Sequence, residues 1–240
     1  MKRFFTNVCT VLASMLLIVS MLVLSIEMFA MNRGFFDSEY TKLDTAEYIG
    51  MSEDDLRETT DVLLGYTAGT RDTLDFQAEI GGETQEVFGT REKDHMVDVR
   101  NLYIAVRNFR TWGLVAAAVL TGAAFLISRK KAVLSLCRSF LYTSSAFLVI
   151  VIAVGLYAVI DFTSFWTSFH HVFFTNDLWI LDPRTDVLIQ MVPEQFFFDL
   201  VTRIIVRFVA IFAGLNIAAF AGKWLYKRSE RKKSDPAEVK

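Results

Sequence analysis

The chain contains three histidines, His95, His170 and His171, and each lies close in sequence to a carboxylate. Asp98 follows His95 by one helical turn, which would place both side chains on the same face of a helix. Asp177 follows the paired histidines. Imidazole is suited to proton transfer because its pKa lies near neutral pH, and a neighbouring carboxylate can orient the ring. Two such imidazoles brought together would supply a general base and a general acid.

Spacing alone leaves two other interpretations open. In the first, His95 is a solvated residue, and His170 or His171 is an amphipathic side chain at an interface. In the second, two histidines and an aspartate form a three-ligand zinc or copper site, although no tight ligand spacing supports it. The sequence has no Gly-rich phosphate loop and no G-x-S-x-G, C-x-x-C or H-E-x-x-H motif. We expect no bound cofactor and no metal.

Aromatic residues crowd the segment 162–199 around His170. Phenylalanine and tryptophan at this density are typical of a membrane–water boundary, where a flat ring buries its body in the hydrocarbon edge. Desolvation at such a place disfavours a charged imidazole. The rings near His170 include Phe169, Phe173, Phe174 and Trp179.

Two arginines, Arg203 and Arg207, lie four residues apart within the last apolar stretch of the chain. Charged groups inside a membrane span are costly and are usually paired or face a cavity. One interpretation is that they reach toward the outer surface and pair with Asp199. The other is that they border a polar pocket and contribute to substrate binding.

Four apolar runs must position these residues. They cover residues 1–30, 112–128, 140–161 and 200–225. A helix rises 1.5 Å per residue, so roughly 20 residues cross the hydrocarbon core of a bilayer. The chain is 53% hydrophobic, which is high for an ordinary soluble domain. We therefore expect four transmembrane helices.

Charge is unevenly distributed, although the net charge is only −2. Lys and Arg gather at the start of the first run, at Lys2 and Arg3, in the link 129–139 and in the tail 226–240. Basic residues beside membrane spans mark the cytoplasmic side, so both termini are expected inside. From Met31 to Thr111 the chain has seventeen Asp and Glu against nine Lys and Arg, which is not a nucleic-acid-binding surface.

The stretch 31–111 is too long for a linker and is expected to be an extracellular cap. Ser52 is a candidate helix N-cap. Alternating residues on either side of Gly81 and Gly82 predict a β-hairpin. The expected fold is a membrane all-α core of four transmembrane helices, with N-terminus and C-terminus in and a small mixed α/β extracellular cap.

A helix starting at Thr90 or Arg91 is expected to carry His95 and to continue into the second span, with a kink at Gly113 as one option. A straight helix would hold His95 roughly 25 Å above the membrane boundary. The helix must therefore kink, tilt or lie flat if His95 is to meet His170.

Two blocks of the sequence resemble the lipoprotein intramolecular transacylase family of Gram-positive bacterial integral membrane proteins. The first is His95-Met96-x-Asp98-Val99-Arg100, and the second begins with Phe169-His170-x-x-Phe173-Phe174. The second block continues as Asn176-Asp177-x-Trp179, Asp182-Pro183-x-Thr185-Asp186 and Pro193-Glu194-x-x-Phe197. The resemblance covers nearly the whole chain, including the four spans and the cap.

This resemblance implies an acyltransferase at the outer face of the cell membrane, with His95 and His170 as its catalytic residues. It also implies that the aromatic rings around His170 are the walls of the substrate site, with Phe169, Phe173, Phe174 and Trp179 as the candidate wall residues. The implied reaction moves the sn-2 acyl chain of a diacylated lipoprotein to the α-amine of its N-terminal cysteine and leaves a lyso-form lipoprotein. The implied partners are that lipoprotein and the lipid bilayer. Two alternatives stay open: a non-catalytic membrane sensor or interaction module, and a metal-dependent membrane hydrolase.

Overall fold

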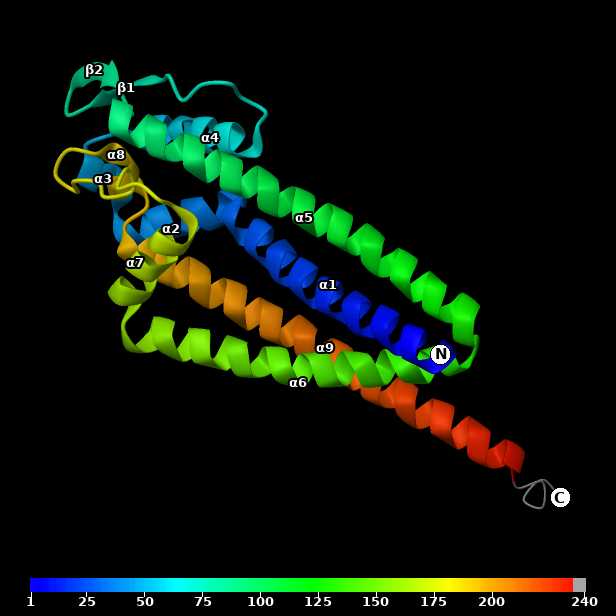
Figure 1. Ribbon diagram of the computed structural model, residues 1–240. Helices are drawn as coiled ribbons and strands as arrows, with labels where there is room; N and C mark the ends of the chain where they lie inside the picture. Colours follow the sequence, from blue (N-terminus) through cyan, green and yellow to red (C-terminus); the bar gives the residue numbers. More distant parts are fainter. Residues whose placement is uncertain (235–240) are drawn as a thin grey trace. The chain divides into compact units, whose positions relative to one another are not determined.

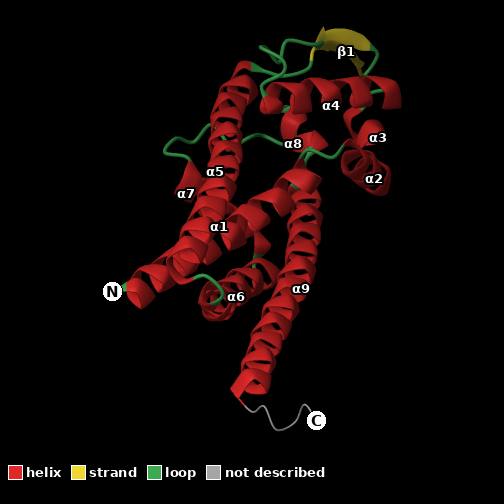
Figure 2. Ribbon diagram, turned by 90° about the vertical axis from the view of Figure 1, so that its right-hand side faces the viewer, coloured by secondary structure: helices red, strands yellow, loops and turns green. Residues whose placement is uncertain are grey.

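The computed structural model describes residues 1–234 of the chain, and these are mostly helical (Figures 1 and 2). Four helices are long: α1 (Lys2–Ala30), α5 (Thr90–Ser128), α6 (Lys131–Ile160) and α9 (Glu194–Ser234). Five are shorter: α2 (Arg33–Leu43), α3 (Thr45–Ile49), α4 (Glu53–Ala68), α7 (Phe162–Phe173) and α8 (Val187–Met191). Strands β1 (Gln77–Ile80) and β2 (Glu83–Glu86) form one antiparallel hairpin.

The four long helices are each long and apolar enough to cross a membrane, so the expected number of spans is confirmed. Helix α1 lies within its predicted run, whereas α5, α6 and α9 each start before the apolar run that predicts them. Helix α6 starts at Lys131, within the stretch 129–139 that was expected to be a link. Helix α9 takes in the end of the segment 162–199 and the start of the tail 226–240, whose last six residues lie outside the described part of the chain.

The connection between α5 and α6 is short because Arg129 ends α5 with a positive φ of 49°. Its backbone N–H donates to the carbonyl of Phe125 at 2.7 Å, and its own carbonyl accepts from the N–H of Ala132 at 2.9 Å. A left-handed residue is a usual helix end, and no helix breaker follows before Phe140. Helix α6 can therefore begin at once.

The chain divides into two compact units. The first, here called the span unit, contains residues 1–25, 109–156 and 205 onward. Its apolar core is formed by Ile18, Phe140, Phe208 and Phe212. Gly113 lies against α1, because a Cβ at this position would approach the Ser20 hydroxyl oxygen to 2.9 Å. Helix α5 is continuous through Gly113, so the helix does not break there.

The second unit, here called the site unit, contains residues 26–108 and 157–204. The expected hairpin is present, and Gly81 and Gly82 have φ values of 64° and 88°, as a tight two-residue turn requires. The Ser52 hydroxyl accepts from the backbone N–H of Asp55 at 3.0 Å, which confirms this N-cap. The site unit thus combines the stretch predicted as the cap with the aromatic segment.

Candidate active site

His95 on α5 and His170 on α7 lie side by side, with their ring centroids 6.1 Å apart and their planes inclined by 37°. Both side chains are buried, at 7% and 6% relative exposure. His171 is exposed and contacts the edge of the Trp179 ring at 5.3 Å. Of the two neighbouring histidines, His170 is therefore the one that faces His95.

The tautomer of His170 follows from its backbone contact. Its Nδ1 atom lies 2.8 Å from the carbonyl oxygen of Trp166, one turn earlier on α7. A carbonyl oxygen only accepts, so Nδ1 carries the proton and donates. In the neutral ring, Nε2 then keeps its lone pair and is able to accept a proton.

Burial lowers the pKa of both imidazoles. The pKa of His95 falls to about 4, first because of desolvation and then because of the neighbouring His170, while Asp98 opposes the shift. Desolvation also lowers the pKa of His170, against the Trp166 carbonyl that stabilises its protonated form. Both rings are therefore neutral at pH 7 and form an uncharged pair.

Aromatic rings enclose this pair. Phe174 is buried and contacts both histidines, at 5.3 Å from the His95 ring and 5.7 Å from the His170 ring. Trp179 stacks on His170 at 4.5 Å, with the ring planes inclined by 23°. Phe169 packs edge-on against His170 at 5.5 Å, whereas Phe173 contacts Phe169 and is half-exposed. Three of the four expected wall residues thus touch a histidine.

Two buried polar atoms at this site lack a hydrogen-bond partner among the residues that the structure describes. They are Nδ1 of His95 and the indole Nε1 of Trp179. Buried polar groups are nearly always paired, so an unpaired one calls for an explanation. Both belong to rings that contact His170, which makes them candidates for contact with a substrate.

The first turn of α5 holds the loop that carries Trp179. The Arg91 guanidinium donates to the backbone carbonyls of Ile180, at 3.0 Å, and of Asp177. These carbonyls flank Trp179 in the chain, so Arg91 fixes the indole over His170. The sequence analysis did not single out Arg91.

Glu92 joins α5 to α8. It is buried, and its two carboxylate oxygens accept from the backbone N–H groups of Leu188, at 2.6 Å, and of Gly89, at 2.5 Å. The second bond caps α5, as a glutamate at the third helical position commonly does. Desolvation raises the pKa of Glu92, and these two bonds oppose the rise. Glu92 lies one turn before His95 on α5.

The chain from residue 11 to residue 197 matches the family model described as "Lipoprotein intramolecular transacylase Lit". The chain belongs to this family. The matched range includes both histidines and ends before Arg203. A search of curated proteins finds no sequence that matches.

Solved structures of a Lit protein share the fold. An in meso structure of the membrane-integral lipoprotein intramolecular transacylase Lit from Bacillus cereus aligns with a TM-score of 0.71 at 21% identity, covering 94% of this chain and 97% of that chain. Two further structures of that protein, in which one histidine is replaced by arginine or by alanine, align at 21% identity with TM-scores of 0.65 and 0.66. They cover 97% and 95% of this chain, and 95% of their own chains. The fold is thus that of membrane-integral Lit proteins.

The predicted carboxylates contribute to this family member's site indirectly. Asp98 accepts a hydrogen bond from the Asn176 side chain at 2.9 Å, so it ties the loop after α7 to α5. Its influence on His95 is electrostatic, through the pKa, and no hydrogen bond joins the two in the described residues. Asp177 contacts Arg91 through its backbone carbonyl.

The arginines lie elsewhere. Arg203 pairs with Glu39 at 3.3 Å and lies over the Phe35 ring, so the interpretation in which Arg203 pairs with Asp199 is wrong. Asp199 is taken by Lys42, which reaches it from α2. Glu39 is only 1% exposed, and a buried carboxylate is costly unless a cation pairs with it. Residue spacing in the sequence does not reveal that Glu39 is buried. Arg207 is exposed and belongs to the span unit.

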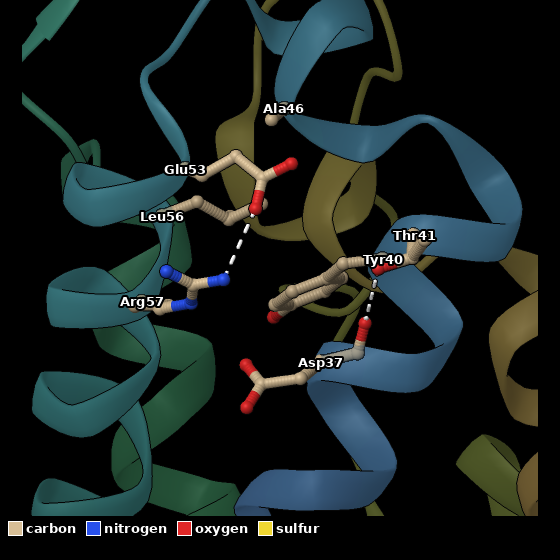
Figure 3. Close-up of a pocket in the computed structure, with 7 residues that line it drawn as sticks. All are labelled: Asp37, Tyr40, Thr41, Ala46, Glu53, Leu56 and Arg57. Atoms are coloured by element: carbon tan, nitrogen blue, oxygen red, sulfur yellow. Dashed lines mark hydrogen bonds and ion pairs between the residues drawn. The ribbon is translucent and has the colours of Figure 1, made fainter.

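Among the described residues, no group of three or more His, Cys, Asp or Glu side chains is placed to hold a metal ion. A cavity of about 30 Å³ lies between α2 and α4 (Figure 3). Its lining includes Tyr40 and the ion pair of Arg57 with Glu53, and its volume suits water, not a lipid.

Proposed function

We propose that this chain transfers the sn-2 acyl group of a diacylglyceryl-modified lipoprotein to the α-amine of the same lipoprotein's N-terminal cysteine, giving the lyso-form. The buried, neutral pair of His95 and His170 is the observation that carries this proposal. Membership of the transacylase family supplies the reaction class.

The reaction needs the substrate head to fold back on itself. Attack of the amine on the ester closes a ring of N, Cα, Cβ, S, two glyceryl carbons, the ester oxygen and the acyl carbon. Such a ring is entropically unfavourable, so holding the reacting atoms together should supply much of the rate. The rings of Phe174, Trp179 and Phe169 provide rigid, apolar walls for that purpose.

One proton leaves the amine and one joins the departing glyceryl oxygen. The free Nε2 lone pair of His170 suits it as the acceptor, because its Nδ1–H is engaged with the Trp166 carbonyl. The pKa of His95 falls to about 4, so His95 is neutral at pH 7 and can protonate the glyceryl oxygen once it has received the proton that His170 took from the amine. The N–C(acyl) bond forms as the O–C(acyl) bond breaks, and the net proton count is unchanged.

The acyl carbonyl oxygen gains negative charge in the tetrahedral intermediate and needs a hydrogen-bond donor. The buried Nε1–H of Trp179 lacks a partner among the described residues and belongs to the ring stacked on His170. We assign it this role. Arg203, a candidate from the sequence, is already engaged with Glu39.

The proposal places the reaction at the outer face of the cell membrane. The basic residues at the N-terminus, at the α5–α6 turn and at the end of α9 favour the cytoplasm for those segments. Residues 31–111 and 162–199, which carry the histidines, then lie outside, where they meet lipoproteins of the outer leaflet.

Acyl transfer from a purified diacylated lipoprotein tests the proposal. His95→Ala and His170→Ala should each lower the rate by about 10²–10⁴-fold, the usual contribution of a general acid or base. Mass spectrometry of the lipoprotein N-terminus identifies the product, and thermal stability is measured in parallel. Near-normal rates in both variants would overturn the mechanism and favour a sensor or interaction module. Loss of activity in chelator, with recovery on adding zinc, would favour a metal-dependent hydrolase.

A further inference from the structure

The span unit contains a second candidate binding site, separate from the histidine pair. A cavity of about 1650 Å³ is lined by residues of α1, the α5–α6 turn, α6 and α9. Pockets for small molecules usually measure about 300–1,000 Å³, so this one has room for a large polar group together with part of an apolar chain. It contains none of the residues assigned to acyl transfer.

The lining is strongly basic. Eight of its nineteen residues are Lys or Arg, and Glu230 is its one acidic residue. The cations come from four parts of the chain, with Lys2 and Arg3 on α1, Arg129 in the turn, Arg138 on α6, and Lys223 on α9. Such a concentration of positive charge favours an anionic ligand.

Two of these cations are held at the junction of α6 and α9. Arg138 and Lys223 are half-buried, and neither forms an ion pair within the described residues. The helices approach closely there, since a Cβ on Gly222 would lie 3.1 Å from the sulfur of Cys137. Partly desolvated cations without a counter-ion are costly, and a bound anion would relieve that cost.

Neutral polar groups and an apolar wall complete the cavity. The Ser135 hydroxyl donates to the Asn7 side chain at 2.7 Å, so α1 and α6 are joined beside the cations. Val11, Ile127 and Leu134 add apolar surface. A phosphate group beside hydrocarbon is the headgroup region of an anionic phospholipid, and basic pockets between membrane helices are suited to it.

We propose that this cavity binds the headgroup of an anionic phospholipid, with the phosphate between Arg138 and Lys223. The site lies at the end of the span unit where basic residues predict the cytoplasmic leaflet. The bound lipid would link α1, α6 and α9 through one shared counter-ion.

The test uses the full chain purified in neutral detergent, with phosphatidylglycerol added in mixed micelles. Phosphatidylglycerol should raise the melting temperature saturably and appear as a retained adduct in native mass spectrometry. Phosphatidylcholine with the same acyl chains should do neither. An equal response to phosphatidylcholine would overturn the proposal. An equal response to inorganic phosphate would show a general anion site and would also overturn it.

Variants that remove positive charge test whether the lining residues of this cavity form the lipid site. The double variant Arg138→Gln with Lys223→Gln should raise the half-saturating phosphatidylglycerol concentration by about tenfold or more, because each basic residue near an anionic lipid adds measurably to binding. If that pair fails to fold, the exposed pair Lys131→Gln with Lys227→Gln replaces it. Arg228→Gln is the matched control, because Arg228 follows Lys227 on α9 but packs on Trp224 outside the lining. If both double variants have the same half-saturating phosphatidylglycerol concentration as Arg228→Gln, the assignment of the site is wrong.

Discussion

The indole ring of Trp179 stacks on the imidazole of His170 at a centroid distance of 4.5 Å, and its buried N–H has no partner in the described chain. This contact holds the Trp179 indole against the His170 ring and leaves the indole N–H free to donate a hydrogen bond. A free N–H donor at a buried site is what the negative charge of a tetrahedral intermediate requires.

Trp179→Phe should therefore lower acyl transfer by about 10²-fold, as loss of one oxyanion donor does elsewhere. A benzothienylalanine at position 179 keeps the two-ring shape and lacks the N–H, so it should be nearly as slow. Product formation by mass spectrometry is the measurement. Trp112→Phe, an exposed tryptophan, is the control. A benzothienylalanine enzyme with normal turnover would show that the ring matters and the N–H does not.

Combining the two histidine substitutions should reveal that they act together. Because both groups serve one transition state, the double variant His95→Ala with His170→Ala should be about as slow as the slower single variant. His171→Ala should be mild, since its ring is exposed and contacts Trp179, whereas the His170 ring is the one that contacts His95. Multiplicative effects in the double variant would indicate independent roles.

Glu92→Gln should destabilise the fold. The carboxylate accepts from two backbone N–H groups, and the amide would turn one acceptor into a donor facing an N–H. Leaving a buried donor unsatisfied costs roughly 1–3 kcal/mol, to be measured by thermal or denaturant unfolding. Asp94→Asn, an exposed change in the same helical turn, is the matched control. Equal stability of the two variants would contradict a holding role for Glu92.

Stability should also depend on pH through His95. Its folded pKa of about 4 lies below the ordinary value of 6.5, so the unfolded chain binds the proton more readily. The free energy of unfolding should fall as the pH drops from about 6.5 to about 4, by on the order of 3 kcal/mol at most. His95→Gln should flatten this part of the profile. An unchanged slope in that variant would assign the dependence to other groups.

Reporter fusions test the orientation of the chain. In the proposed topology, an insertion between Gly81 and Gly82 should be external. The turn should tolerate added residues, since a Cβ at either glycine would meet nothing within 4 Å. An insertion at the Arg129–Lys130 turn should be cytoplasmic. The opposite result at either site would invert the proposed topology.

Local patterns in the sequence predicted the elements well. Apolar length alone gave the four long helices, and the pair Gly81-Gly82 gave the hairpin, because both signals are contained in consecutive residues. The family motifs pointed to His95 and His170, and the structure brings these two rings together. Their roles in catalysis stay predictions.

The partners of buried charges could not be predicted in the same way. Glu39 and Arg203 form an ion pair although they are 164 positions apart in the sequence, and the residues around each of them do not predict its partner. The contact between His95 and His170 was expected to need a helix that kinks, tilts or lies flat. In the structure, Arg91, Glu92 and Asp98 bind the chain after α7 to the start of α5. The bonds of Arg91 and Glu92 go to backbone groups, which carry no sequence signal, and the side chains of Asp98 and Asn176 meet across 78 positions of the sequence.

The same bonds fix when the site comes into existence during synthesis. Asp98 and Asn176 are 78 residues apart, and Glu92 and Leu188 are 96 apart, with the whole of α6 between them. A growing chain that has released α5 therefore carries His95 without the ring that faces it. A ribosome that stalls before α7 leaves a fragment without His170, and one that stalls between α7 and α8 leaves both histidines without the bond from Leu188 to Glu92.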